Sequence, residues 1–283
     1  MLPFVLGMML AVSQVHQHGV ELYGRKQYAA AISVLEDALK TETPESPEYK
    51  ESVLLIGQSY FMLSQATKAI PWLEKAPNSN EANYMLGYAY LQANDRRKSE
   101  VAFARLFELK PDSAAGHLLA AQMMLKKDYD AEAVMEAKAA LALNAKLPEA
   151  HFLLGEVAIY RGDLDGGIQE LQQELALNPN FSMAWYRLGD AYTRKENWDL
   201  AIANLQRAVW LNAEFSGPYI LLGKSYLKKA EYANAEGILR RAVELDPNNQ
   251  SAKYLLGQAL IAAGKKEEGR AILEKLREAQ GGR

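Results

Sequence analysis

Small residues recur along this chain at one fixed interval, and this repeat constrains the fold more than any other feature. From Gly87 onward, a glycine or an alanine stands at every 34th position. The series reads Gly87, Ala121, Gly155, Gly189, Gly223 and Gly257. Self-similarity with a period of about 20–50 residues is typical of proteins that stack copies of one supersecondary unit. We therefore expect a linear array of repeats, in which each copy buries its apolar face against the next.

Each copy contains two apolar runs of helical period, and a short polar turn separates them. Residues 161–163 and 195–197 form two such turns, with the sequences Arg-Gly-Asp and Lys-Glu-Asn. A second small residue follows the first after twelve positions, as Ala201 follows Gly189, and lets two paired helices approach closely. Proline ends several copies, because it cannot continue a helical hydrogen-bond ladder. The prolines at such boundaries are Pro111, Pro179 and Pro247. The pattern predicts an all-α chain of helix pairs.

The copy over residues 182–215 resembles the tetratricopeptide repeat. It reads Ala-Trp-Tyr-Arg-Leu-Gly-Asp-Ala-Tyr over residues 184–192, then Trp-Asp-Leu-Ala-Ile over residues 198–202, with a further alanine at position 208. Residues 219–247 follow the same pattern nearly in full. The resemblance covers about residues 12–283. It implies an all-α fold, namely a right-handed superhelical solenoid of stacked antiparallel helix pairs (an α-α superhelix) with about eight repeats.

The expected repeats make one solenoid domain from residue 12 to residue 283, and three of them depart from the pattern. Their boundaries are 12–45, 50–79, 80–113, 114–147, 148–181, 182–215, 216–249 and 250–283. The first repeat has a histidine before its glycine, Gly19, and the fourth lacks the glycine. The second is four residues short, and Pro71 falls inside its second helix. We expect irregular geometry near Pro71 and less regular stacking between the second and third repeats.

An apolar segment over residues 1–11 precedes the repeats. The stretch from Leu2 to Val12 has no charged or polar side chain, and it is too short to span a bilayer as a helix. Its length suits the apolar core of an export signal, with a small-residue cleavage site at residues 11–13, although a basic leader is missing. The alternative is a buried cap over the first repeat. A signal would indicate an exported, periplasmic protein, whereas a cap would suit a cytoplasmic one. We expect no transmembrane helix elsewhere.

The resemblance also implies a binding surface. In the tetratricopeptide repeat family, the first helices of the pairs line a concave groove that often takes an extended peptide or a partner helix. The groove positions carried over to this sequence give one apolar or aromatic column and two polar columns. The residues expected to contact a partner are Tyr84, Tyr88, Leu118, Phe152, Glu156, Tyr160, Tyr186, Arg187, Asp190, Arg194, Lys224, Lys228 and Tyr254. For each aromatic residue the alternative is packing against a neighbouring helix, although a tyrosine hydroxyl favours water or a partner.

Basic residues gather in the sixth and seventh repeats, with carboxylates beside them. The cations are Arg187, Arg194, Lys224 and Lys228. One interpretation is that they receive an acidic group or a chain terminus of the ligand. The other is a solvated surface that neutralises itself. The family's clamp for acidic C-terminal peptides uses lysines and asparagines at set positions, and the asparagines are absent here, so the ligand of those chaperone adaptors is not implied.

Neither composition nor motifs indicate catalysis or a cofactor. The chain has no cysteine, which excludes disulfides, thiolate metal sites and cysteine nucleophiles. The Gly-Lys-Ser tripeptide at residues 223–225 lacks the upstream glycine of a phosphate-binding loop, because that position is Pro218. His117 and His151 occupy equivalent positions, but no carboxylate joins them at a recognisable ligand spacing, so packing is favoured over a metal site. We expect no catalytic, cofactor-binding or metal-binding residue and no enzyme activity.

Net charge bears on the class of partner. The formal net charge is −3, and the basic triplet at residues 96–98 has no interleaved aromatic residue, so nucleic acid is not an expected partner. The leading hypothesis is a scaffold or adaptor that binds peptide segments of a partner protein in the concave groove, with self-association also possible. The alternative is a structural subunit of an envelope-associated or secretion-type assembly, docked through its N-terminal end.

Overall fold

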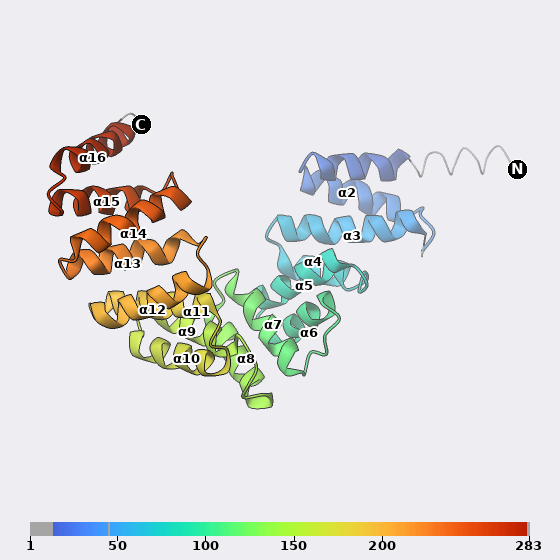
Figure 1. Cartoon of the computed structure of the whole chain (residues 1–283). Helices are drawn as coiled ribbons and strands as arrows, with labels where there is room; N and C mark the ends of the chain where they lie inside the picture. The colour runs from blue at the N-terminus through green and yellow to red at the C-terminus, as the bar shows by residue number, and fades with distance from the viewer. Residues whose placement is uncertain (1–13, 45, 282–283) are drawn as a thin grey trace, which may run out of the picture. The chain divides into compact units, whose positions relative to one another are not determined.

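The computed structural model describes the backbone of residues 14–44 and 46–281, and these residues form helices without any β-strand. A helix over residues 14–24 comes first. The helices that follow are α2 (Tyr28–Leu39), α3 (Pro47–Met62), α4 (Ala66–Leu73), α5 (Asn80–Gln92), α6 (Arg96–Leu106), α7 (Ala114–Leu125), α8 (Asp130–Leu143), α9 (Ala150–Tyr160), α10 (Leu164–Leu177), α11 (Ser182–Arg194), α12 (Trp198–Leu211), α13 (Ser216–Lys228), α14 (Tyr232–Leu245), α15 (Gln250–Ala262) and α16 (Lys266–Gly281) (Figure 1). The all-α class predicted from the sequence is confirmed.

Consecutive helices pack against each other from α2 to α8 and again from α9 to α16, and this arrangement produces a stack of helix pairs in each of the two stretches. From α3 onward, odd-numbered helices are the first helices of pairs and even-numbered helices are the second. Thus α11 packs on α12, α12 on α13, and α13 on α14. Short turns join the two helices of a pair, so the pairs are antiparallel hairpins. A hairpin has one apolar face that it cannot bury alone, and the next hairpin covers it. The predicted architecture of stacked helix pairs is confirmed.

A notch in each first helix sets the position of the second helix. At Gly189 in α11, an added Cβ would lie 2.6 Å from Leu205 Cγ on α12, well inside van der Waals contact. Leu205 is fully buried. The same separation of sixteen residues pairs Gly57 with Leu73, Gly155 with Leu171, and Gly257 with Leu273. The recurring glycine therefore marks the point where a large apolar side chain of the second helix, a leucine in these pairs and Phe103 opposite Gly87, packs on the backbone of the first helix.

The fourth repeat lacks this glycine and compensates for the loss within the same pair. Ala121 in α7 stands at the notch, and the residue sixteen positions later is Ala137 of α8. Both alanines are fully buried. Because alanine is much smaller than leucine, Ala137 leaves room for the Cβ of Ala121. The departure seen in the sequence thus preserves the packing of the pair.

Caps and turns explain the helix boundaries. The Ser79 hydroxyl accepts a hydrogen bond from the Ala82 backbone N–H at 3.2 Å and caps the start of α5. Ser46, Ser113 and Asn249 cap α3, α7 and α15 in the same way. The turn inside each pair contains one residue with positive φ. These residues are Lys26, Ser64, Asn94, Asp128, Gly162, Glu196, Ala230 and Gly264. The turn geometry is therefore shared, whereas glycine, which adopts it most readily, is present at only two of these turns.

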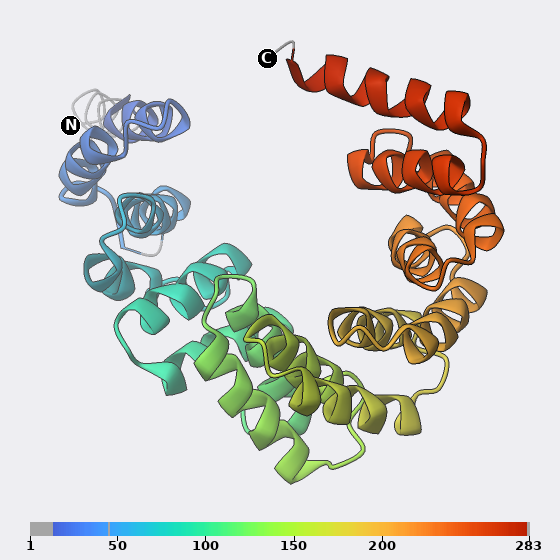
Figure 2. The same ribbon diagram turned by 90° about the vertical axis from the view of Figure 1, so that its left-hand side faces the viewer.

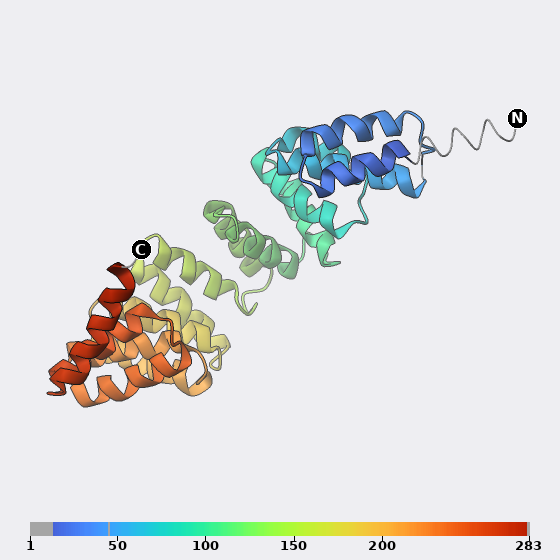
Figure 3. The ribbon, with the colours of Figure 1, turned by 90° about the horizontal axis from the view of Figure 1, so that it is seen from above.

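Contacts divide the chain into two compact units, Met1–Leu147 and Pro148–Arg283, which we call the N-terminal and C-terminal units. Figure 2 shows the stacked pairs of the C-terminal unit in yellow to red, and Figure 3 shows the helices of the N-terminal unit in blue to green. Within the C-terminal unit, the first helices α9, α11, α13 and α15 contact one another in succession. The single solenoid domain over residues 12–283 stays a prediction.

Helix α4 carries the irregularity expected at Pro71. It spans eight residues, whereas α12, the second helix of the sixth repeat, spans fourteen. Pro71 lies inside α4 and has no N–H to donate, and the helix ends at Leu73. The loop over residues 74–79 then leads to α5. Helix α4 still packs against both α3 and α5, so the shortened pair keeps its place in the stack.

The interpretations of the N-terminal segment concern residues 1–13, which lie outside the described residues. Export signal and buried cap therefore both stay predictions. Within the part of the chain that the structure describes, no helix has the combination of length and apolar character that crossing a bilayer requires.

Candidate functional site

The first helices of the C-terminal unit form one continuous layer. Helices α9, α11, α13 and α15 contact each other, whereas the second helices pack on the first helices and not closely on one another. The stack is therefore tighter on the first-helix side, which is the inner side of this unit. We call its surface the inner face. The helices of this layer carry ten of the residues predicted to contact a partner, namely Phe152, Glu156, Tyr160, Tyr186, Arg187, Asp190, Arg194, Lys224, Lys228 and Tyr254.

Two tyrosines on the inner face are open to solvent. Tyr160, the last residue of α9, is 80% exposed, and Tyr254 in α15 is 51% exposed. The Tyr254 hydroxyl accepts a hydrogen bond from Gln258 Nε2 at 2.9 Å, one helical turn further along. Exposed tyrosines offer large contact area at a low cost in side-chain entropy. Among the predicted contact residues of these helices, Tyr160 and Tyr254 are the aromatic side chains with the largest exposed fraction.

Two other aromatic residues of the inner face pack at the junctions between pairs. The Phe152 ring lies 4.7 Å from the ring of Phe181, and the Tyr186 ring lies 5.0 Å from that of Phe215 in an edge-to-face arrangement. Phe181 and Phe215 stand just before α11 and α13, at equivalent positions of successive repeats. Burial raises the pKa of Tyr186 and keeps its phenol neutral. These half-buried rings hold the stack together and present only part of their surface.

Charged side chains on α9 and α11 are paired with one another. Arg187 Nε donates a hydrogen bond to Glu156 Oε1 at 2.6 Å and thereby links α11 to α9. Arg194 lies 2.9 Å from Asp190 Oδ2, one turn earlier on α11. The Arg187 guanidinium also lies 5.4 Å from the centre of the Tyr186 ring, a cation–π distance. Two of the four predicted cations are therefore neutralised within the face.

The two lysines of α13 have a different environment. Lys224 is half-buried and Lys228 is exposed, and neither forms an ion pair with any other described residue. The next residue, Lys229, pairs with Asp199 and with Glu231, whose Oε1 is 3.5 Å away. The inner face therefore has a net positive charge at α13, between the paired charges of α11 and Tyr254 of α15.

The predicted contact residues of the N-terminal unit are less accessible. Tyr84 is 37% exposed, but Tyr88 is only 3% exposed. The Tyr88 hydroxyl donates to the Met123 carbonyl oxygen at 2.9 Å, and its ring packs edge-on against Phe103. Burial raises the pKa of the Tyr88 phenol. Leu118 is half-buried in α7. Tyr88 thus acts mainly in packing between α5, α6 and α7, which leaves Tyr84 as the accessible tyrosine of this unit.

A buried cluster of titratable groups in the N-terminal unit is absent from the sequence prediction. His117 Nδ1 on α7 lies 2.8 Å from Glu100 Oε1 on α6 and 2.7 Å from Glu136 Oε2 on α8. No carboxylate at a recognisable ligand spacing was expected beside this histidine, but two neighbouring helices bring carboxylates to it from distant positions. Arg97 lies 2.9 Å from Glu100, and Arg96 lies 3.1 Å from Glu136.

Burial sets the protonation of this cluster. Desolvation, together with contact to Glu100, raises the pKa of Glu136 to about 7, although His117 and Arg96 act in the opposite direction. Burial also raises the pKa of Glu100, but hydrogen bonds with Glu136 and Arg97 outweigh it and lower the pKa overall. The ligand atoms of the three residues lie within 4.8 Å of one another, a spacing that a metal ion would also need. The arrangement is a histidine between two buried glutamates, with one arginine beside each glutamate.

The repeat pattern contained a signal for this cluster. His151 Nδ1 lies 2.7 Å from Glu170 Oε2, and both residues stand 34 positions after His117 and Glu136. In both repeats the carboxylate follows the histidine by nineteen residues. A search for polar pairs at a constant separation in successive repeats would have found it.

The glycine of the Gly-Lys-Ser tripeptide has a packing role in the structure. Gly223 lies in the middle of α13, and a Cβ at this position would collide with Leu239 of α14. It is thus the notch glycine of the seventh repeat, as the repeat pattern predicts.

Profiles of the family "Tetratricopeptide repeat" match most of the chain. One matches residues 16–83 and 152–217, a second matches 81–113, and a third matches 226–283. The stretch between these matches contains α7 and α8, where Ala121 and Ala137 replace the usual glycine and leucine. A search of curated protein sequences gives no significant match.

Several solved structures have a similar fold. MamA from Desulfovibrio magneticus, from residue 41 to its end, is 22% identical with a TM-score of 0.56, over 60% of this chain and 96% of that one. PilF from Pseudomonas aeruginosa is 18% identical with a TM-score of 0.58, over 72% of this chain and 93% of that one. The Cut9–Hcn1 hetero-tetramer of the APC/C contains a chain that is 20% identical, with a TM-score of 0.52, over 87% of this chain and 48% of that one. At these identities the likeness concerns the fold alone.

Proposed function

The chain belongs to the tetratricopeptide repeat family, and we propose that it is a protein-interaction scaffold whose inner face binds an extended peptide segment of a partner protein. The observation that carries this proposal is the pair of exposed tyrosines, Tyr160 and Tyr254, on a continuous layer of first helices. Exposed aromatic residues on a rigid helical layer are typical anchors of protein interfaces. The proposal assigns no cofactor and no catalytic step to the chain.

The face combines apolar anchors with fixed polar groups. Tyr160 and Tyr254 lie on α9 and α15, at the two ends of the layer, and Glu156, Arg187 and Asp190 lie on α9 and α11 between them. The Glu156–Arg187 ion pair joins two helices and therefore holds polar atoms in place before a ligand arrives. Pre-organised polar groups lower the entropic cost of binding. An extended peptide that crosses the layer meets an aromatic side chain, then hydrogen-bonding groups, and then a second aromatic side chain.

Charge indicates where an acidic ligand residue would bind. Arg187 and Arg194 are paired with Glu156 and Asp190, so they have little remaining attraction for an anion. Lys224 and Lys228 have no carboxylate partner among the described residues and lie on the same helix. A carboxylate of the ligand would complete a charge-assisted hydrogen bond there. We therefore place an acidic residue of the peptide over α13.

Selection of peptides from a random displayed library tests the proposal without a known partner. Peptides enriched on the wild-type chain are expected to contain acidic and apolar residues. Their affinity is then measured for the Tyr160→Ala/Tyr254→Ala double variant, and we expect it to fall by at least about tenfold. Both tyrosines are exposed, so circular dichroism and the thermal midpoint should stay unchanged.

Trp210 provides a matched control on the opposite layer. It lies on α12, a second helix, and is 70% exposed, so it offers as much aromatic surface as the tyrosines. Trp210→Ala should leave the affinity within about twofold, below the effect of a binding anchor. Equal affinities of the wild-type chain and the tyrosine double variant would exclude the inner face as the binding surface, and so would a loss confined to Trp210→Ala.

A further inference from the structure

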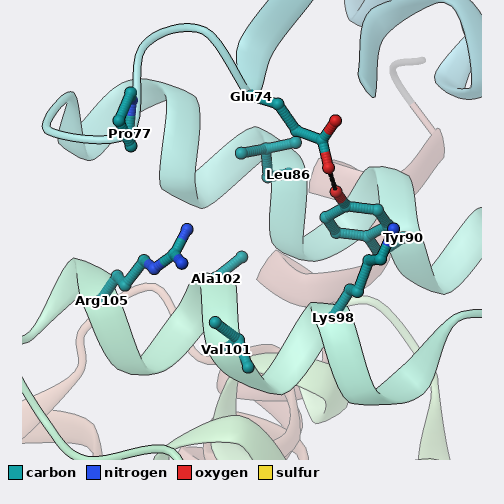
Figure 4. A pocket seen from close by; sticks show the side chains of 8 residues that line it. All are labelled: Glu74, Pro77, Leu86, Tyr90, Lys98, Val101, Ala102 and Arg105. Atoms are coloured by element: carbon teal, nitrogen blue, oxygen red, sulfur yellow. Dashed lines mark hydrogen bonds between the residues drawn. The ribbon is translucent and has the colours of Figure 1, made fainter. Parts of the chain in front are cut away.

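The N-terminal unit has a cavity next to the C-terminal end of the short helix α4. Its volume is about 460 Å³, and residues of α5, α6 and the loop after α4 line it (Figure 4). In the regular pairs the second helix runs fourteen residues, as in α12, whereas α4 ends at Leu73 after eight. The loop that replaces the missing turns passes Pro77, which lies at the mouth of the cavity. The cavity is therefore a consequence of the shortened repeat.

The floor of this cavity is apolar. Leu86 and Ala102 are each 2% exposed, and they meet where α5 crosses α6. Charged side chains, Lys98 and Arg105 on α6 and Glu74 on the loop, surround this floor. An apolar floor with a few charged groups at its edge is typical of a small-molecule pocket, and such pockets have volumes of about 300–1,000 Å³.

The negative charge at the edge already has a partner. The Tyr90 hydroxyl donates a hydrogen bond to Glu74 Oε1. Burial, together with this hydrogen bond, raises the pKa of Tyr90, so the phenol remains a donor at neutral pH. Lys98 Nζ lies 5.2 Å from the centre of the Tyr90 ring, on the same side of the cavity. Lys98 also has a weak ion pair to Asp95 at 3.9 Å.

Arg105 stands apart from this group. Figure 4 shows its side chain across the cavity from Glu74 and Tyr90, with Ala102 between them. No ion pair joins Arg105 to another described residue. A guanidinium presents a planar fork of donors that matches a carboxylate in two parallel hydrogen bonds. The cavity therefore has an apolar floor and, at one end, the exposed cation Arg105, which forms no ion pair with another described residue.

We propose that this cavity binds a small apolar carboxylate, an acid whose carboxylate pairs with Arg105 and whose aromatic or branched aliphatic group lies on Leu86 and Ala102. The separation between Arg105 and Glu74 keeps the ligand's negative charge away from the carboxylate on the opposite side. A free small acid and the C-terminal residue of a peptide share this chemistry. The site is independent of the inner face, because it belongs to the N-terminal unit.

Titration of the full chain with N-acetyl-L-phenylalanine tests the proposal, with its carboxamide as the matched ligand control. We expect saturable binding of the acid, followed by calorimetry or by NMR shifts, and at least about tenfold weaker binding of the uncharged amide. Arg105→Gln should weaken binding of the acid by a similar factor. Arg25→Gln, which alters a cation that is 70% exposed elsewhere in the same unit, should leave it unchanged.

Two further probes distinguish the sources of the carboxylate. If 3-phenylpropionate binds more tightly than Gly-Gly-Phe with a free C-terminus, the ligand is a free acid. If Gly-Gly-Phe binds more tightly, the ligand is the C-terminal residue of a peptide. Either result supports the site. Equal binding of the acid and its amide overturns the proposal, and so does the absence of saturable binding by any acid. An unchanged circular dichroism spectrum and thermal midpoint of Arg105→Gln confirm that the variant is folded.

Discussion

Leu205 fills the notch that Gly189 leaves in α11, so closely that a Cβ on residue 189 would lie 2.6 Å from Leu205 Cγ. Gly189→Ala should therefore destabilise the C-terminal unit by about 1–3 kcal/mol, the usual cost of overpacking a close-packed interior. The loss occurs although alanine has the higher helix propensity. Urea denaturation followed by circular dichroism measures it.

Removal of the side chain opposite provides the control for this prediction. Leu205→Ala alone should cost about 2–5 kcal/mol through the cavity it creates. In the double variant Gly189→Ala/Leu205→Ala, the new methyl group enters that cavity, and the total cost should be clearly below the sum of the two single changes. The fully buried pair Ala121 and Ala137 shows that the fold accepts this combination. Strictly additive effects would mean that the notch does not govern packing within the pair.

Two residues in left-handed turns, one alanine and one glycine, should change the stability of the chain in opposite directions when each is replaced by the other residue type. Ala230 has φ +60° and Gly264 has φ +90°, both in the turn between the helices of a pair. Ala230→Gly should stabilise the chain by about 0.5–1 kcal/mol, because the Cβ strain of a left-handed residue outweighs the extra backbone entropy of glycine. Gly264→Ala should destabilise it by a similar amount, although no atom lies within 4 Å of the added Cβ. Changes of the same sign in thermal midpoint would contradict this explanation.

Glu136 predicts a pH dependence of stability. Its pKa is raised to about 7 in the folded chain, above the value of 4.5 for an unperturbed glutamate. Between these pH values the folded state holds a proton that the unfolded state has released, so the stability that this group contributes falls as the pH rises from 4.5 to 7. Glu136→Gln mimics the protonated form. The stability of Glu136→Gln relative to wild type should therefore increase from pH 5 to pH 8. Thermal unfolding of both proteins across this pH range measures the difference.

The next repeat offers the matched control for this titration. Glu170 contacts His151 as Glu136 contacts His117, each at 2.7 Å, but its side chain is 29% exposed, so Glu170→Gln removes the same kind of contact without removing a buried carboxyl group. Any change of stability with pH that Glu136→Gln shows beyond that of Glu170→Gln then comes from the buried carboxyl group of Glu136. Glu100 has a lowered pKa, so its own contribution disappears only below pH 4.5, outside the measured range. If the stability of the two variants relative to wild type changes equally with pH, the buried carboxyl group of Glu136 does not cause the pH dependence.

The unpaired lysines of α13 predict salt-sensitive binding. Lys224→Gln/Lys228→Gln should weaken an acidic peptide selected by the wild-type chain by about 5–30-fold, equivalent to one or two charge-assisted hydrogen bonds. The same change should flatten the dependence of affinity on salt. Lys229→Gln is the control, since Lys229 already pairs with Asp199 and Glu231. If Lys229→Gln weakens the peptide as strongly as the double variant, general charge attraction explains the binding and the lysines do not form a site.

The fold was predictable from the sequence because one packing contact recurs. Each notch glycine fixes the position of a second helix, so the period of 34 residues already encodes the pairs and their stacking. Side-chain accessibility was harder to predict. Tyr88 and Tyr254 occupy neighbouring columns of the repeat, yet one is 3% exposed and the other 51%. The difference depends on what the next repeat supplies, such as Phe103 and the Met123 carbonyl oxygen around Tyr88.

Contacts between repeats were also beyond a reading of single motifs. His117 receives its carboxylates from α6 and α8, from positions seventeen residues before and nineteen residues after it. A spacing rule for ligands on one helix cannot find such a group. The cavity beside Arg105 also depends on several segments at once, because the loop after the short helix α4 and residues of α5 and α6 line it together.

Site-specific photo-crosslinking tests the central claim, that the inner face of the C-terminal unit binds an extended peptide. A photoreactive phenylalanine analogue replaces Tyr254 in one variant and Trp210 in another, and each variant is irradiated with a peptide selected by the wild-type chain. Both positions are exposed, at 51% and 70%, so each probe can reach a peptide bound at its own position. We expect a crosslinked product from position 254 that excess unlabelled peptide suppresses, and none from position 210. Crosslinking at position 210 alone, or equally at both positions, would contradict the account.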